Sequence, residues 1–200
     1  MVTPPRRAGR APAPLAAVIA GLAGSALALA LAPAAMPASY SWTAHTTSES
    51  AAQGVAGAWV ARLGFVLLGV AVVGLAALRP PRWPPLARGL HAGFGVLIVA
   101  AAVFSSRSWE AAAPYDRTED VLHSLAASTM GIAFAGGVVA VGLALRPRRV
   151  EPLAAVAVVA SIGLPLAMVA WDDVSGLLQR AMFAVAYAWY GTEAVLARHA

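Results

Sequence analysis

The sequence predicts an all-α, polytopic membrane protein: a bundle of six transmembrane helices with both termini in the cytoplasm. The chain has 200 residues, 60% hydrophobic and 12% charged, with a mean hydropathy of +0.73. Soluble domains have about 45–50% apolar and about 25% charged residues. This chain therefore has too little charge to cover a globule with a wetted surface. A soluble enzyme, a nucleic-acid-binding domain and a disordered chain are excluded, and nucleic acid is no expected partner.

A helix that crosses a bilayer needs about 20 mostly apolar residues. Six segments meet this requirement, at about 15–35, 56–78, 86–104, 121–145, 153–171 and 174–196. Strands of a β-barrel would be about 10 residues long with alternating polarity, so helices are favoured. We expect a cytoplasmic tail over residues 1–14 and one transmembrane domain over residues 15–197.

Prolines mark the joints of the second and third segments and of the fourth and fifth, because proline stops helices. These residues are Pro80, Pro81, Pro84, Pro85, Pro147 and Pro152. The first segment has a second interpretation, since three arginines precede it and small residues follow it, as in a secretory signal. Its apolar run exceeds the usual length of about 7–15 residues, which favours a span, but cleavage stays an open alternative.

The arginines set the predicted orientation. Lysine and arginine accumulate on the cytoplasmic side of membrane proteins. Ten of the fourteen basic residues fall on one predicted side: Arg6, Arg7, Arg10, Arg79, Arg82, Arg88, Arg146, Arg148, Arg149 and Arg198. We therefore expect a multi-pass protein of the plasma (inner) membrane, with an even number of spans.

Two packing signals agree with this arrangement. Tryptophans fall at predicted boundaries, as an aromatic belt requires. Those at the outer boundary are Trp42, Trp59, Trp109 and Trp171, and Trp83 is at the inner one. Gly89 and Gly93 form a small-xxx-small pair, which together with many alanines indicates a tight bundle.

Seven of the nine carboxylates fall on the predicted outer side, where two arginines lie inside helices. A charge at that depth must pair, reach the surface or line a wet cavity. We expect an outer-side polar pocket that binds a lipid headgroup or a small anion, with Arg62 and Arg180 as an anion clamp. The candidate ligand-binding residues are Arg62, Arg180, His123, Glu49 and Asp116.

A competing interpretation gives these arginines a structural role only. Arg62 would form an ion pair with Glu49, and Arg180 would pair with Asp172 or Asp173. Such pairs would fix the register of the helices without any ligand.

Catalysis and transport remain as alternatives. A membrane-embedded hydrolase would use His123 with Asp120 or Glu49; Asp120 and His123 share a helix face if that helix begins before Thr118. The chain has no cysteine, no lysine and no His-Glu-x-x-His motif, so we expect neither a metal site nor a cofactor. A small oligomeric transporter is the other alternative, although no carboxylate is predicted at mid-membrane depth.

Short motifs resemble a known family. They are the Trp59-x-x-Arg62-x-Gly64-Phe65-x-x-x-Gly69 segment, the acidic segment that ends at His123, and Gly176-Leu177-Leu178-Gln179-Arg180. Together they resemble the bacterial six-helix membrane family catalogued as domain of unknown function 998, which is distantly like the Frag1/DRAM/Sfk1 group. The resemblance implies a six-helix inner-membrane protein and no established reaction or ligand. We therefore expect a non-enzymatic protein whose partners are membrane lipids or a small anionic ligand, with a homo-oligomer left open.

Overall fold

The computed structural model describes residues 13–145 and 151–198, and within these ranges every long element is an α-helix. The six helices are α1 Ala13–Leu31, α2 Ala58–Ala77, α3 Pro85–Val103, α4 Arg117–Ala144, α5 Pro152–Ala170 and α6 Ser175–Arg198. The predicted all-α, six-helix fold is thus confirmed. Most of the predicted cytoplasmic tail, together with Arg146, Arg148 and Arg149, lies outside the described residues.

Helix α4 begins earlier than the sequence predicts, at Arg117 instead of residue 121. The reason is an N-cap: Asp116 Oδ1 accepts hydrogen bonds from the backbone N–H of Thr118 at 2.7 Å and of Glu119 at 3.2 Å. A cap of this kind satisfies two of the N–H groups that a helix start leaves unpaired. Asp120 and His123 consequently lie on the same helix.

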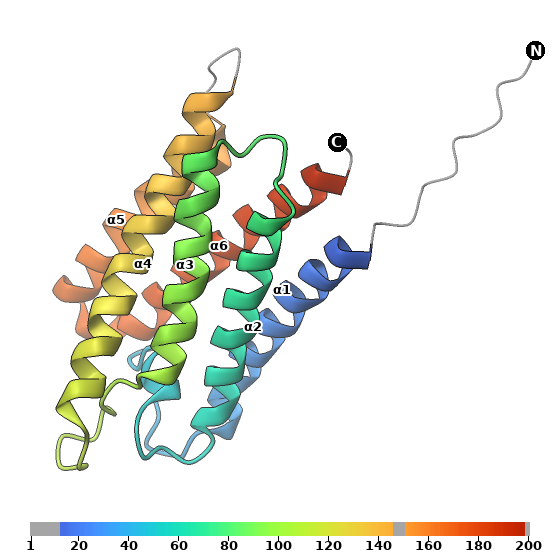
Figure 1. Ribbon diagram of the computed structural model, residues 1–200. Coiled ribbons are helices and arrows are strands. Elements are labelled where there is room, and N and C mark those ends of the chain that lie inside the picture. Colours follow the sequence, from blue (N-terminus) through green and yellow to red (C-terminus); the bar gives the residue numbers. More distant parts are fainter. Residues whose placement is uncertain (1–12, 146–150, 199–200) are drawn as a thin grey trace, which may run out of the picture.

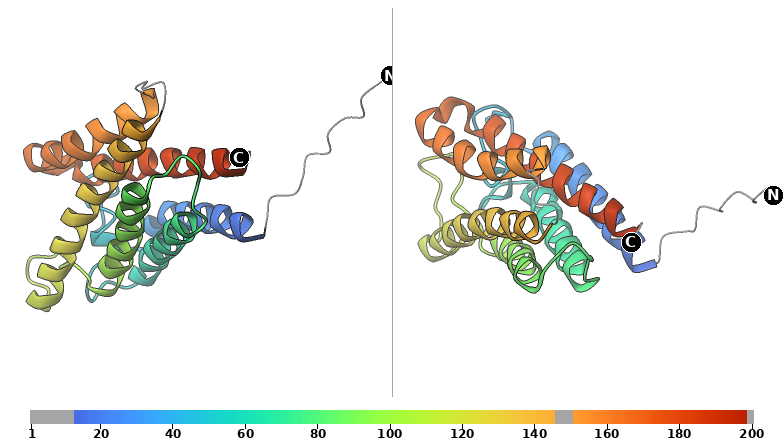
Figure 2. Two further views of the ribbon diagram at one scale, coloured as in Figure 1. Left: turned by 45° about the horizontal axis from the view of Figure 1, so that its top comes forward. Right: turned by 90° about the horizontal axis from the view of Figure 1, so that it is seen from above.

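The helices follow the chain order around a ring. Each of α1 to α5 packs on the next helix, and α6 returns to α1. Seen from above, α2, α3 and α4 form one layer and α5, α6 and α1 form the other (Figure 2). Figure 1 shows the loop after α2, the end of α4 and the start of α5 at one end of the molecule, near the end of α6, and the loops after α1 and α3 at the other.

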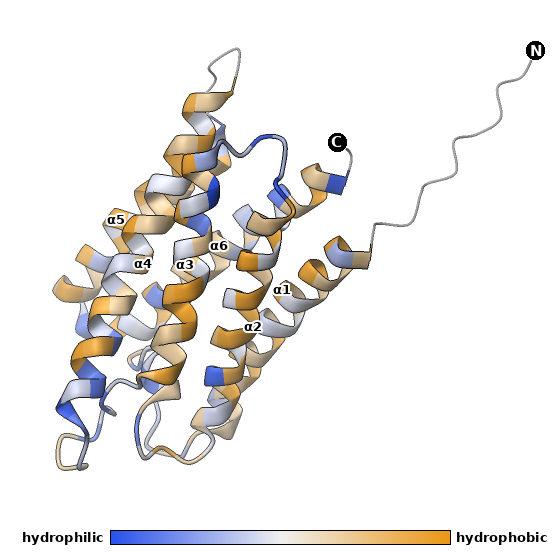
Figure 3. Cartoon of the chain, in the orientation of Figure 1, coloured by the Kyte–Doolittle hydropathy of each residue, from blue (hydrophilic) through white to orange (hydrophobic). Residues whose placement is uncertain are grey.

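The two ends differ in charge. The end with the loop after α2 carries Arg79, Arg82 and Arg88, and we call it the arginine-rich end. The other end, with the loops after α1, α3 and α5, carries seven of the nine carboxylates, and we call it the acidic end. Apolar residues fill the helices between them (Figure 3). This is the charge distribution expected of a protein that spans a membrane with both termini on one side.

Five of the six helices, α1 to α5, are long and apolar enough to cross a membrane. Helix α6 is also long, with 24 residues, but Arg180 and Glu193 lower its hydropathy. Both charged groups have protein partners, with Arg180 bound to loop carbonyls and Glu193 beside Arg82. We therefore treat α6 as the sixth span. The protein has the architecture of a multi-pass helical membrane protein.

Glycines allow α1, α2 and α3 to approach closely. A methyl group added at Gly95 of α3 would lie 2.7 Å from the carbonyl oxygen of Gly69 on α2. On the other side of α2, Gly64 lies against Leu29 of α1, and its carbonyl accepts a 2.6 Å hydrogen bond from Ser25 Oγ. Small residues at helix contacts are typical of membrane bundles.

An aromatic cluster fills the half of the bundle nearest the arginine-rich end. Trp83 belongs to it, with only 3% of its surface exposed, and its Nε1 donates to Glu193 Oε2 at 2.9 Å. The prediction that Trp83 joins an interfacial belt is therefore wrong, because its N–H finds a buried carboxylate instead. At the acidic end, Trp42, Trp59 and Trp171 are exposed, as a belt requires.

We expect Trp83→Phe to lower the free energy of unfolding by about 1–3 kcal/mol, because the buried Glu193 carboxylate loses a donor. The measurement is unfolding by denaturing detergent, followed by circular dichroism. Trp59→Phe is the control, since Trp59 is 68% exposed and makes no described hydrogen bond. Equal effects of the two substitutions would show that the Trp83–Glu193 bond contributes nothing.

Candidate functional site

Two loops fold together over the acidic end, and Gln53 joins them. Its Nε2 donates to the carbonyl oxygens of Ser105 at 2.7 Å and of Asp116 at 3.0 Å, while its Oε1 accepts from Asp116 N–H at 2.7 Å. Asp116 thus connects the loops through its backbone and caps α4 through its side chain. These contacts give the predicted ligand residue Asp116 a structural role in the described chain.

Arg62 also binds backbone. Its Nε and Nη2 each donate at 3.0 Å, to the carbonyl oxygens of Ala51 and Ala52. These carbonyls end the short 3₁₀ helix Glu49–Ala51, where helical partners are missing. The alternative ion pair of Arg62 with Glu49 is not formed, since Glu49 Oε2 accepts from Thr46 N–H at 2.7 Å and from Thr46 Oγ1 at 2.9 Å.

Arg180 holds the first loop against the start of α6. Its Nη1 donates to the carbonyl oxygens of Trp42 at 2.7 Å and His45 at 3.0 Å, and its Nη2 donates to the Tyr40 hydroxyl at 2.6 Å. The guanidinium also lies 5.0 Å from the centre of the Trp42 ring. Burial raises the pKa of Tyr40, which keeps its hydroxyl protonated and able to donate to loop carbonyls.

The two arginines therefore do not pair with the acids proposed for them. Among the described residues, no ion pair joins Arg62 or Arg180 to Glu49, Asp172 or Asp173. The guanidinium groups of Arg62 and Arg180 instead satisfy carbonyl groups that the loop leaves without backbone partners. We find that their main contacts are structural.

A cavity of about 350 Å³ opens at the acidic end, and we call it the polar cavity. It is lined by Thr46, Ser48, Glu49, Ser106, Arg107, Ser108, Asp120, His123, Ser124, Ala127, Ser128 and Gln179. The structure thus brings together Glu49, Asp120 and His123, which the sequence singled out. Arg62, Arg180 and Asp116 do not line it.

His123 is fixed in orientation. It is 4% exposed, and its Nδ1 lies 2.9 Å from the carbonyl oxygens of both Ala101 and Phe104, at the end of α3. Since both partners accept, Nδ1 carries a proton, and Nε2 is the acceptor atom of the ring in its neutral form. No described residue forms a hydrogen bond with Nε2.

The Asp–His pairing that a hydrolase would use is absent from the described hydrogen bonds. Asp120 Oδ1 accepts from the backbone N–H of Arg107 at 2.9 Å, and His123 is oriented by carbonyl groups. Within the described ranges, no group of three or more histidine or carboxylate side chains is placed to hold a metal ion. Within the described residues, the polar cavity therefore holds neither a hydrogen-bonded Asp–His pair nor a cluster of metal ligands.

A second cavity of about 580 Å³ adjoins the first, and we call it the apolar crevice. It lies between α4, α5 and α6, and it shares Ala127, Ser128 and Gln179 with the polar cavity. Ile132 and Val169 line it and are 74% and 86% exposed, so it opens sideways toward lipid. The opening exists because α5 buries little of its surface, with Ala157 as its one buried residue among those described.

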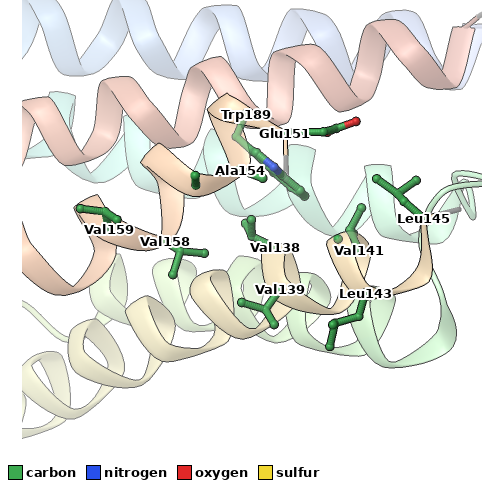
Figure 4. Close-up of a pocket in the computed structure, with 12 residues that line it drawn as sticks. Val138, Val139, Val141, Leu143, Leu145, Glu151, Ala154, Val158, Val159 and Trp189 are labelled. Carbon is green, nitrogen blue, oxygen red and sulfur yellow. The ribbon is translucent and has the colours of Figure 1, made fainter. Parts of the chain in front are cut away.

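The seam between α4 and α5 also holds an apolar cavity of about 410 Å³ nearer the arginine-rich end. Figure 4 shows Val138 and Val158, from α4 and α5, in its walls, with Trp189 of α6 beside them. Apolar space therefore lies along α5 in both halves of the bundle.

Sequence reasoning missed Gln179 and Arg107 as lining residues of the polar cavity. Gln179 Oε1 accepts from the backbone N–H of Ser48 at 3.1 Å, which joins α6 to the first loop. A signal was present, because Gln179 directly precedes Arg180 in the final motif and is an uncharged polar residue inside a predicted span. Nothing in the local sequence of Arg107 distinguishes it from the other loop arginines.

The family model described as protein of unknown function (DUF998) matches residues 6–196. The chain belongs to this family, as its motifs indicated. No curated protein and no solved structure gives a significant match. The more distant likeness to the Frag1/DRAM/Sfk1 group stays a prediction.

Proposed function

We propose that this DUF998 protein binds a phospholipid of the outer leaflet, with the headgroup in the polar cavity and an acyl chain in the apolar crevice. One observation carries the proposal: the two spaces share Ala127, Ser128 and Gln179. A single ligand that fills both must be polar at one end and apolar at the other. Membrane phospholipids have this form.

The side of the membrane follows from the arginines. If the arginine-rich end faces the cytoplasm, the polar cavity faces the outer side of the plasma membrane. The exposed rim at Ile132 and Val169 then lies within the bilayer, where a lipid enters without crossing water. A volume of about 580 Å³ is within the usual range of about 300–1,000 Å³ for ligand pockets.

Binding is a better account of the site than either alternative. A small free anion would leave the apolar crevice without a role, and the carboxylates of the polar cavity would repel it. A hydrolase would need a carboxylate on His123, where carbonyl groups are found. The exposed face of α5 is also available to a second copy of the chain, so a homo-oligomer stays a prediction.

The test blocks the junction of the two spaces. We expect Ser128→Trp to remove most of the phospholipid that co-purifies with the protein, measured by native mass spectrometry in a mild detergent. Thr129→Trp is the matched control, because Thr129 is the exposed neighbour on α4 and lines neither space.

Thermal unfolding of both variants shows whether each retains the fold. Equal phospholipid retention by the two folded variants would refute the proposal.

A further inference from the structure

We infer that the bound headgroup carries a primary ammonium beside its phosphate, as phosphatidylethanolamine does. This inference rests on the proposed function and adds the chemical class of the lipid. It follows from the charges, the free acceptors and the residue types of the polar cavity.

The charge of the polar cavity favours a cation. Among its described lining residues, Glu49 and Asp120 are carboxylates and Arg107 is the one arginine. Two carboxylates and one guanidinium therefore line the polar cavity, and the helices of the bundle shield it from water on one side. An anionic headgroup would add to an existing excess of negative charge.

Free acceptors are present for the N–H groups of an ammonium. Both protein hydrogen bonds of the Glu49 carboxylate fall on Oε2, and that of Asp120 falls on Oδ1, so one oxygen of each has no described donor. In the neutral ring, His123 Nε2 is a third acceptor without a described partner, on a side chain that is 4% exposed. A primary ammonium offers three N–H donors, and bonds from a charged donor to a carboxylate are stronger than neutral ones.

Arg107 supplies the partner for the phosphate. Its backbone N–H binds Asp120, but its guanidinium makes no hydrogen bond or ion pair with any residue in the described ranges. The side chain lines the polar cavity and is exposed, so it can reach a phosphate group. Arginine binds phosphate oxygens with two parallel N–H groups.

Choline headgroups fit this site poorly. A trimethylammonium has no N–H donor, and proteins recognise it through aromatic rings. None of the described residues that line the polar cavity is phenylalanine, tyrosine or tryptophan. The site therefore favours ethanolamine over choline, and it disfavours glycerol and serine headgroups because both leave the lipid with net negative charge.

The test uses the unmodified protein and a series of lipids with identical acyl chains. Delipidated protein in detergent is titrated with phosphatidylethanolamine, its N-methyl and N,N-dimethyl derivatives, phosphatidylcholine and phosphatidylglycerol, and bound lipid is counted by native mass spectrometry. We expect affinity to fall at each methylation, by about tenfold or more from ethanolamine to choline. Phosphatidylglycerol should also bind more weakly than phosphatidylethanolamine.

Variants assign the preference to the polar cavity. The Glu49→Gln, Asp120→Asn double variant should lose most of the preference for ethanolamine over choline lipids, because the amide side chains keep acceptors for the protein's own bonds but lose the charge. Arg107→Gln should weaken the binding of both lipids by a similar factor. Asp173→Asn, an exposed carboxylate outside the cavity, should retain the preference.

The outcomes separate this inference from the proposed function. If ethanolamine and choline lipids bind equally, and Ser128→Trp abolishes the binding of both, the inferred headgroup is wrong and the proposed lipid binding stands. Preferential binding of phosphatidylglycerol overturns the inferred headgroup as well. If no phospholipid in the series binds the folded protein, the proposed function itself fails.

Discussion

Replacing Gly95 by alanine should destabilise the bundle, whereas replacing Gly93, two residues earlier on α3, should not. A methyl group at Gly95 would lie 2.7 Å from the Gly69 carbonyl oxygen and 3.2 Å from Val73 N, both backbone atoms of α2. Backbone cannot rotate away as a side chain can, so α2 and α3 must separate. A methyl group at Gly93 meets nothing within 4 Å.

The pair forms a matched test because the substitution and the helix are the same. Overpacking at a tight contact costs about 1–3 kcal/mol. Alanine is favoured over glycine inside a helix by about 1 kcal/mol, and this gain applies to both variants. We therefore expect Gly93→Ala to unfold at the same or higher denaturant than the native protein, and Gly95→Ala at lower denaturant.

Unfolding of both variants in one detergent, followed by circular dichroism, provides the measurement. If Gly93→Ala lowered the stability as much as Gly95→Ala does, the α2–α3 contact would not be the cause of the destabilisation.

These glycines also show what the sequence could and could not predict about the fold. The number and order of the helices follow from the lengths of the apolar segments, and the difference in charge between the two ends follows from the positions of the arginines. Both signals reflect how the chain meets the bilayer, so they depend on no tertiary contact. Spacing alone picked the pair Gly89 and Gly93, yet neither meets a neighbour within 4 Å. The close contact uses Gly69 and Gly95, because which face of a helix meets its neighbour depends on helix rotation, and composition does not encode rotation.

The candidate site was predictable in part for a similar reason. Glu49, Asp120 and His123 were expected at one end of the bundle, and the structure lines one cavity with them. The partners of Arg62 and Arg180 were not predictable. A loop that turns over a helix end leaves carbonyl groups unpaired, and buried carbonyls must find donors. A count of side chains suggests acids as the partners of these two arginines, because the composition gives no information on which backbone carbonyl groups of a loop lack a partner.

The largest effect at the acidic end is expected from Arg180→Ala. The substitution removes donors to the carbonyl oxygens of Trp42 and His45 and to the Tyr40 hydroxyl. Hydrogen bonds to charged groups contribute about 1.5–3 kcal/mol each, so a total loss of about 3 kcal/mol or more is expected. The first loop should then be held less firmly on α6, which detergent unfolding and protease cleavage between residues 41 and 46 would both report.

Arg180→Lys distinguishes geometry from charge. Lysine keeps the positive charge but cannot present planar donors to several carbonyls while stacking on the Trp42 ring. We expect this variant to recover less than half of the lost stability. Arg117→Ala is the control, because Arg117 is exposed and its side chain makes no hydrogen bond within the described ranges. If Arg180→Lys were as stable as the native protein, charge alone would suffice, and the carbonyl network could not be what holds the loop on α6.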